Sequence, residues 1–289
     1  MRPRVALATY DRAPSLAPDD QLLIPALRAA GIDAEPAVWT FDDVIWETFD
    51  AVVVRSCWDY HLRYEQFREW LERLDGSRLP VFNSIALIEW NSHKRYLIDL
   101  SRRGVPIVPT QLIAADDSDA VISAVRDAGW SRFVLKPAVS ASGYETHAFA
   151  AEVDAAARHT IASVIESGDV LVQPFMEEVP SHGEYSLVYI DGRFSHAAIK
   201  RAAESEFRVQ TEHGGSVTPV QVDAQLIEAG SKALAALAEV PLYARVDGIV
   251  RDGEFLLMEL ELIEPNLFLD LQAGSPEAFA SALAERLAG

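Results

Sequence analysis

Three carboxylates near the carboxyl terminus have the residue types and spacing of a divalent-metal site. Glu259 and Glu261 stand two residues apart in an apolar stretch, so on a strand both side chains point to one face. The turn signal Asp252-Gly253 would bring Asp247 onto the neighbouring strand. Carboxylates gathered among apolar residues repel one another and lose hydration unless a cation joins them. Oxygen ligands favour Mg²⁺ or Mn²⁺, so such an ion is predicted here; the alternative is a solvated face with ordinary surface charges.

Lysines are few, and two of them end strand-like segments. The chain holds only Lys94, Lys136, Lys200 and Lys232. Lys136 closes the apolar run 133–135 and precedes a loop of small residues, Ser140 to Gly143, which can close over a polyphosphate. Any one of these lysines alone could instead be a rim side chain whose ammonium reaches water. Together with the carboxylates, they predict a site for the phosphates of a nucleotide.

Another polar segment follows the buried run 51–54. It reads Arg55, Ser56, Cys57, Trp58, Asp59 and Tyr60. Ligands of open parallel sheets bind at this edge, so Arg55 is predicted to hold a substrate carboxylate and Asp59 an amino group. For Trp58 and Tyr60, packing beneath the next helix is an equal alternative. Arg208 is predicted to line the same cleft.

Strand-like and helix-like segments alternate, which predicts an α/β protein. The region up to about residue 90 is predicted to form a small open parallel sheet. After Glu184, two hairpins are predicted, 185–190 with 193–199 and 243–250 with 254–263, each joined by Asp-Gly. Helices are predicted over 64–74, 84–90, 92–103, 118–128, 152–166 and 223–238.

Two further helices are predicted from their capping residues. Asp19 or Asp20 is expected to cap a helix that runs to Gly31 and is kinked or delayed by Pro25. A last helix is expected to begin at Ser275-Pro276, with the serine as cap and the proline at the first helical position.

The composition narrows the class of partner. The 289 residues carry 25 Lys and Arg against 44 Asp and Glu, a net charge of −19. Such a surface repels nucleic acid and anionic membranes, so neither is an expected partner. Cys57 is the only cysteine, and neither a signal-peptide core nor about 18 consecutive apolar residues is present. A cytoplasmic location without disulfides or a membrane span is therefore predicted.

In this order the elements resemble the ATP-grasp superfamily over nearly the whole chain. The resemblance implies an N-terminal substrate domain (1–90) with an open parallel sheet, followed by a central lobe (91–175) and a C-terminal lobe (176–289) that clamp ATP. The segment 171–176 resembles the adenine hinge of that family, and Glu184 its ribose-binding acid. The resemblance implies ATP-binding roles for Lys94, Lys136, Ser140, Ser142, Gly143, Gln173, Phe175, Met176, Glu184 and Lys200.

The same resemblance implies the catalytic and metal-binding residues. Lys200 and Arg245 match contacts to the transferred phosphoryl group, and Asp247, Glu259 and Glu261 match the metal positions. The cofactors implied are ATP and Mg²⁺ or Mn²⁺, with two ions. The family commonly has Asn at the third metal position, where this chain has Glu261; Asn266 is the alternative residue to complete the site.

The activity implied is that of an ADP-forming ligase of carboxylates and amines acting through an acylphosphate. The runs 55–60, 90–96 and 259–265 are most similar to those of O-ureido-D-serine cyclo-ligases, the ring-closing enzymes of D-cycloserine biosynthesis, in the glutathione synthetase-like branch. A small amino-acid-like substrate is implied, and a homodimer is an expectation. The alternatives are another amino-acid or peptide ligase, a small-molecule kinase, and a nucleotide sensor without turnover. The predicted substrate-binding residues are Arg55, Ser56, Trp58, Asp59, Tyr60 and Arg208.

Overall fold

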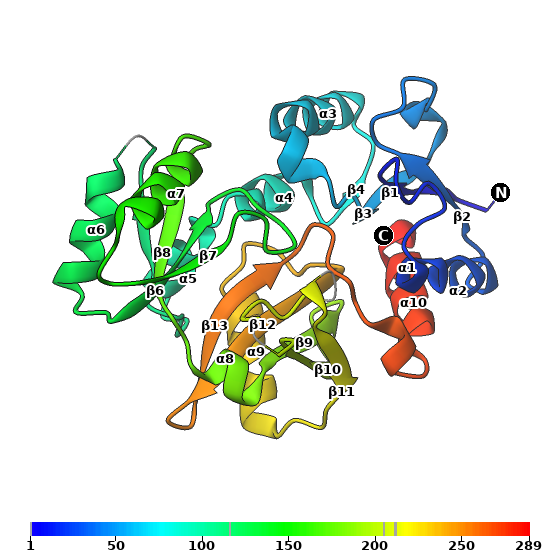
Figure 1. Ribbon diagram of the computed structural model, residues 1–289. Coiled ribbons are helices and arrows are strands. Elements are labelled where there is room, and N and C mark those ends of the chain that lie inside the picture. Colours follow the sequence, from blue (N-terminus) through cyan, green and yellow to red (C-terminus); the bar gives the residue numbers. More distant parts are fainter. Residues whose placement is uncertain (1, 116, 205, 211–212) are drawn as a thin grey trace.

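Three β-sheets organise the chain, one after another along the sequence (Figure 1). The computed structural model describes residues 2–115, 117–204, 206–210 and 213–289. One parallel and two antiparallel sheets, all accompanied by helices, confirm the predicted α/β class. Within the described ranges, no helix is both long and apolar enough to cross a membrane.

The first sheet is parallel, with the strand order β2-β1-β3-β4. Its strands are β1 (Arg4–Thr9), β2 (Asp33–Val38), β3 (Ala51–Ser56) and β4 (Val81–Phe82). The two central strands are apolar runs, as a parallel sheet covered on both faces requires. The sequence analysis does not predict β2, because its polar sequence with Pro36 is typical of an edge strand.

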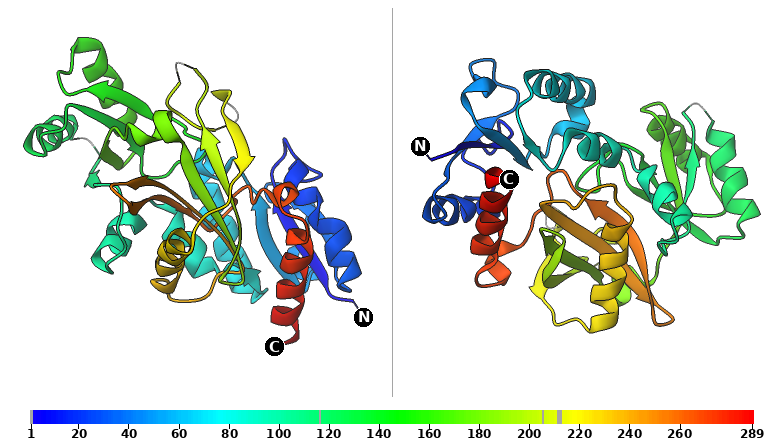
Figure 2. Two further views of the ribbon diagram at one scale, coloured as in Figure 1. Left: turned by 90° about the horizontal axis from the view of Figure 1, so that it is seen from below. Right: turned by 180° about the vertical axis from the view of Figure 1, so that it is seen from behind.

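Helices cover both faces of this sheet. They are α1 (Pro18–Gln21), α2 (Leu23–Ala29), α3 (Tyr64–Ser77) and, from the far end of the chain, α10 (Ser275–Ala288). Val5 and Leu7 share a core with α2 and α10, whereas Ala6 and Ala8 share one with α3. Figures 1 and 2 show α10 beside α2, so the carboxyl terminus returns to the N-terminal sheet.

Both predicted helix starts differ in detail from the structure. The first helix begins at Pro18, and neither Asp19 nor Asp20 is its cap. It breaks after Gln21 and resumes as α2, which holds Pro25 in its first turn, where the missing N–H has no helical partner to lose. In α10 the cap is Gly274; the hydroxyl of Ser275 instead donates to the Leu269 carbonyl at 2.9 Å.

The second sheet is antiparallel, with the order β5-β8-β6-β7. Its strands are β5 (Gln111–Ile113), β6 (Arg132–Pro137), β7 (His147–Ala150) and β8 (Val170–Pro174). The predicted helices here are confirmed as α6 (Ser118–Asp127) and α7 (Ala155–Ile165), and both share an apolar core with β6 and β8. The short β5 and β7 carry too few residues for a period to be read.

The third sheet contains both predicted hairpins, in the order β11-β10-β9-β12-β13. Its strands are β9 (Glu184–Ile190), β10 (Arg193–Arg201), β11 (Ser216–Pro219), β12 (Tyr243–Arg251) and β13 (Glu254–Glu261). Asp252 and Gly253 have φ values of 52° and 82°, the left-handed conformation that a tight hairpin turn requires at both central residues. Two helices accompany this sheet, α8 (Glu178–His182) and α9 (Ala224–Ala235).

Two asparagines tie the first and third sheets together. Asn83 precedes α4 (Ile85–Ser92), Asn91 lies in the last turn of α4, and α5 (Tyr96–Arg102) follows. Asn83 donates to the carbonyls of Tyr243 and Leu262 at 3.0 and 2.8 Å. Asn91 donates to Leu260 O at 2.8 Å and accepts from Leu262 N at 3.0 Å. Because these side chains replace missing sheet partners, the end of β13 is fixed against the N-terminal region.

Candidate active site

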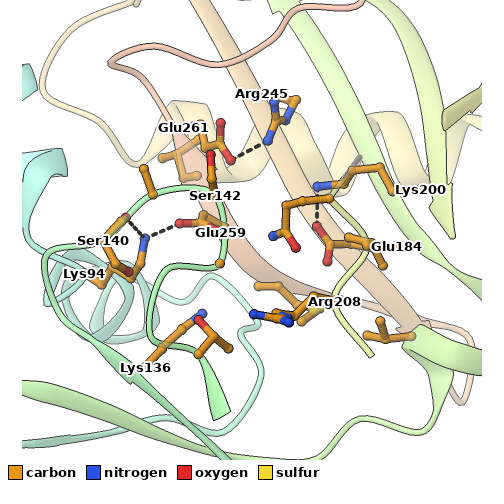
Figure 3. Close-up of a pocket in the computed structure, with 18 of the residues that line it drawn as sticks. Lys94, Lys136, Ser140, Ser142, Glu184, Lys200, Arg208, Arg245, Glu259 and Glu261 are labelled. Atoms are coloured by element: carbon orange, nitrogen blue, oxygen red, sulfur yellow. Dashed lines mark hydrogen bonds and ion pairs between the residues drawn. The ribbon is translucent and has the colours of Figure 1, made fainter. Parts of the chain in front are cut away.

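A cavity of about 250 Å³, here called the main cavity, opens between the second and third sheets (Figure 3). Its walls come from β6, β8, β10, β12 and β13 and from the segments that follow β3 and β13. Most predicted site residues line it: Trp58, Tyr60, Lys94, Lys136, Ser140, Ser142, Gly143, Gln173, Phe175, Met176, Glu184, Lys200, Arg208, Arg245, Glu259 and Glu261.

The hairpin of β12 and β13 sets the acidic wall of this cavity. Asp247 lies directly opposite Glu259, and Arg245 lies opposite Glu261. The predicted hairpin that brings Asp247 onto the strand beside Glu259 is confirmed, but its register shifts by one residue between Asp247 and Gly248; without that shift the tight turn would set Asp247 opposite Met258. Glu259 and Glu261 face the cavity, with side chains 27% and 28% exposed, whereas the Asp247 side chain is 1% exposed and lies behind the wall.

Asp247 is held by three donors. Ser186 Oγ donates at 2.7 Å, Lys200 Nζ at 2.8 Å, and the Arg245 guanidinium at 2.9 to 3.1 Å. Burial alone would raise the pKa of Asp247, but Arg245 and Lys200 hold it well below its usual range. Lys200 also pairs with Glu184 at 2.6 Å (Figure 3). Asp247, Lys200 and Arg245 are therefore charged at neutral pH, whereas burial raises the pKa of Glu184.

Each cavity-facing glutamate also pairs with a cation. Lys94 contacts Glu259 and donates to the Ser140 carbonyl at 2.9 Å, which links the acidic wall to the small-residue loop. Arg245 contacts Glu261 and donates to Asn266 O at 2.9 Å. Figure 3 shows the two cations, Lys94 and Arg245, on opposite sides of the two glutamates.

Lys136 is the unpaired cation of the site. Within the described residues, no carboxylate lies in ion-pair distance of its ammonium group, although it lines the main cavity. Burial lowers the pKa of Lys136, and the charge of Lys94 lowers it further, while Glu259 opposes the shift. An anionic ligand could therefore pair with the Lys136 ammonium group, which has no carboxylate partner and is partly shielded from water.

The donor chemistry of the acidic wall fits a hard divalent cation. Glu259, Glu261, Glu264 and Asn266 offer only oxygen or amide donors to the cavity. Burial, with repulsion from neighbouring carboxylates, raises the pKa of Glu261 to about 7 and that of Glu264 to about 8, so both carboxyls hold their protons near neutral pH unless a cation joins them. In the part of the chain that is described, no three such side chains already converge as ligands. The carboxylates of Glu259 and Glu261 are turned toward Lys94 and Arg245 instead.

Three of the predicted substrate-binding residues, Arg55, Ser56 and Asp59, do not reach the main cavity. Arg55 is 0% exposed; it donates to Asp20 Oδ1 at 2.9 Å and to Pro265 O at 2.6 Å. Ser56 donates to the other oxygen of Asp20 at 2.6 Å. Because Arg55 is fully buried and already pairs with Asp20, it cannot reach a substrate carboxylate in the main cavity, although its Nη1 has no hydrogen-bond partner.

The sequence analysis misses Glu264, which lines the main cavity three residues after Glu261. Its position could have been predicted, because Glu264 follows β13 closely and residues just after a strand lie at the same edge of the sheet as the last side chains of that strand. It also misses Asp20, since no local pattern connects that residue to Arg55.

Comparison with known proteins supports the resemblance that the sequence analysis describes. A family model of the N-terminal domain of the D-cycloserine synthetase DcsG matches residues 5–83. The cycloserine biosynthesis protein DcsG of Streptomyces lavendulae is 34% identical over 280 residues, which cover 92% of each chain. The predicted resemblance to ring-closing ligases of cycloserine biosynthesis is thus confirmed at the level of the family.

Solved structures agree with this assignment. The crystal structure of D-cycloserine synthetase DcsG matches with a TM-score of 0.90 and 30% identity, covering 98% of this chain and 99% of that one. D-alanine–D-alanine ligase from Bacillus anthracis complexed with ATP matches with a TM-score of 0.67 at 15% identity, covering 99% and 97%. The second match shows the fold alone and confirms the ATP-grasp architecture. The chain belongs to the DcsG family of ATP-grasp ligases.

Proposed function

We propose that this ligase uses ATP to activate the carboxylate of O-ureido-D-serine and closes it to the ring of D-cycloserine. The observation that carries the proposal is the main cavity, in which Lys94, Lys136, Lys200 and Arg245 surround a buried acidic wall. A relative with 34% identity over 92% of the chain bears the name of a cycloserine biosynthesis protein.

In this proposal the substrate carboxylate attacks the γ-phosphorus of ATP, and ADP leaves. A nitrogen of the same molecule then attacks the acyl carbon and displaces phosphate. Because the ring nitrogen of D-cycloserine bears no carbamoyl group, water must cleave its bond to that group, which leaves as carbamate and breaks down to carbon dioxide and ammonia. The lysines and Arg245 neutralise the charge that spreads over the transferred phosphoryl oxygens, and their fixed positions require little reorganisation.

The residues of the main cavity are assigned to ATP, metal or substrate according to their position. The proposed ATP-binding residues are Lys94, Lys136, Ser140, Ser142, Gly143, Gln173, Phe175, Met176, Glu184 and Lys200. We propose that Glu259 and Glu261 hold Mg²⁺, with Asp247 orienting Arg245 and Lys200 behind them. When bound, Mg²⁺ would neutralise phosphate charge. Trp58, Tyr60 and Arg208 also line the main cavity, and we propose that they bind the substrate.

The test is an ADP-release assay over a panel of D- and L-amino acids that includes O-ureido-D-serine. ADP and D-cycloserine, identified by mass spectrometry, are expected with O-ureido-D-serine and Mg²⁺. Hydroxylamine should trap the activated acyl group as a hydroxamate. AMP release would rule out the acylphosphate, and a stable phosphorylated product would indicate a kinase instead.

A further inference from the structure

Glu264 lines the main cavity without a cationic partner. The other glutamates that line this cavity each pair with a lysine or an arginine: Glu184 with Lys200, Glu259 with Lys94, and Glu261 with Arg245. Among the described residues, no lysine or arginine lies within ion-pair distance of the Glu264 carboxyl group, and the residue is half-buried. A carboxylate that is partly removed from water is stabilised by a cation, which a ligand in the main cavity can bring.

The backbone around Glu264 is held from several sides. The carbonyls of residues 263, 264, 265 and 266 accept side-chain hydrogen bonds, in that order, from Tyr243 Oη at 2.9 Å, Trp58 Nε1 at 3.0 Å, Arg55 Nη2 at 2.6 Å and Arg245 Nη1 at 2.9 Å. These donors belong to β3, to the segment that follows it and to β12, so the first and third sheets both fix this segment. A side chain on a fixed backbone loses less freedom when it binds a ligand.

The Glu264 carboxyl group lies among the charges of the acidic wall. Burial, with the charges of Glu261 and Glu259, raises the pKa of Glu264 to about 8, and the nearby charge of Lys94 opposes the shift. In an α-amino acid, the ammonium and the carboxylate share one carbon. A substrate whose carboxylate reacts beside Glu259 and Glu261 therefore places its ammonium next to them as well. Glu264, three residues after Glu261, is the unpaired carboxylate within reach of that position.

We propose that Glu264 binds the α-ammonium group of the substrate. The inference rests on the proposed function, in which the carboxylate on the same carbon is activated at the acidic wall. The sequence analysis assigns the amino group to Asp59, but that residue does not line the main cavity. An ammonium group supplies the cation that Glu264 lacks, and a charge-assisted hydrogen bond to a fixed carboxylate holds the reacting carbon in place. Glu264 thereby discriminates against analogues without an amino group, which leave it unpaired.

The first test compares O-ureido-D-serine with its desamino analogue, which lacks only the α-amino group. Wild type should favour O-ureido-D-serine about 10-fold or more in kcat/KM, and Glu264→Gln should lose this preference while its KM for ATP stays unchanged. Glu228→Gln, on the exposed face of α9, is the matched control and should keep the preference. A wild type that does not distinguish the two compounds, or a folded Glu264→Gln variant that still does, would overturn the proposal.

Manganese binding separates this role from metal ligation. Electron paramagnetic resonance of Mn²⁺, with ADP present, measures the affinity of the acidic wall for a divalent ion without turnover. The affinity should fall in Glu259→Gln and stay at the wild-type value in Glu264→Gln. An equal loss in the two variants would make Glu264 a metal ligand and overturn the proposal.

Equilibrium binding distinguishes a failure of this inference from a failure of the proposed function. In calorimetry with ADP and Mg²⁺, O-ureido-D-serine should bind wild type about 10-fold more tightly than Glu264→Gln, and the desamino analogue should bind both alike. That result in an enzyme that releases no ADP would support the ammonium site and refute the proposed function. If another amino acid of the panel releases ADP instead, the proposed function fails, and the same comparison with that amino acid tests the site; equal affinities for wild type and Glu264→Gln would overturn it.

Discussion

Replacing Arg55 should unfold the N-terminal half rather than weaken substrate binding alone. In Arg55→Met, Asp20 keeps only its hydrogen bond from Ser56, and Pro265 O loses its donor. Removing one partner of a buried ion pair costs about 3–5 kcal/mol, and an unsatisfied carbonyl adds about 1–3 kcal/mol. The guanidinium also lies 4.5 Å from the Tyr243 ring, a contact that methionine replaces only in part. A loss on the order of 5 kcal/mol is a large share of the stability of a domain.

The assay is urea unfolding, monitored by tryptophan fluorescence, of Arg55→Met, Asp20→Asn and the double variant. The double variant should lose less than the sum of the single losses, by a few kcal/mol, because it leaves no buried charge unpaired. Arg68→Met removes an exposed ion pair and should stay within about 0.5 kcal/mol of wild type. If Arg55→Met unfolds at the wild-type midpoint and only raises the KM for the carboxylate substrate, the structural assignment of Arg55 is refuted and a substrate-binding role is restored.

Three further predictions concern the main cavity and the segment behind it. Glu259→Gln should reduce ADP release about 100-fold or more at an unchanged melting temperature, because it removes a charge from the cavity wall while keeping the side chain's shape; loss of the fold would make the residue structural. Lys136→Met should weaken ATP binding about 10-fold in calorimetry, whereas Lys232→Met, on an exposed helix face, should not; equal affinities would exclude Lys136 from the site. Burial and the charge of Asp20 raise the pKa of Asp19 from 3.8 to about 6, so the folded state binds its proton more tightly than the unfolded state. The stabilisation from that proton is complete below pH 4 and is lost as pH rises to about 6, and the melting temperature of wild type relative to Asp19→Asn should fall across that window; a constant difference would contradict the shift.

Much of the site is predictable because its parts are local. The turn residues Asp252 and Gly253 bring β12 beside β13, and the two-residue period places Glu259 and Glu261 on one face. The bulge between Asp247 and Gly248, which sets Asp247 opposite Glu259, has no such local signal. Glu264 and Asn266 extend the same edge into the following loop. The metal-site hypothesis therefore needed only the last hairpin and its turn.

The partners of the charged residues were not predictable. The sequence analysis assigns Arg55 and Asp59 to the substrate, yet Arg55 pairs with Asp20, 35 residues earlier, and contacts Pro265, 210 residues later. Asp59 accepts a hydrogen bond from Trp39, and its other oxygen is buried without a hydrogen-bond donor. A side chain at a strand end can point into the core or into the cleft, and the periodicity of the strand is the same in both cases.

The sequence by itself determined a parallel sheet near the N-terminus, the two hairpins and the face that Glu259 and Glu261 share, because periodicity and turn conformation act over a few residues. Only the tertiary structure decided which cations pair with the acidic wall, that Lys136 stays unpaired, and that Arg55 is a core residue. Those outcomes depend on distances between segments far apart in the chain and on how completely packing removes water from each charge.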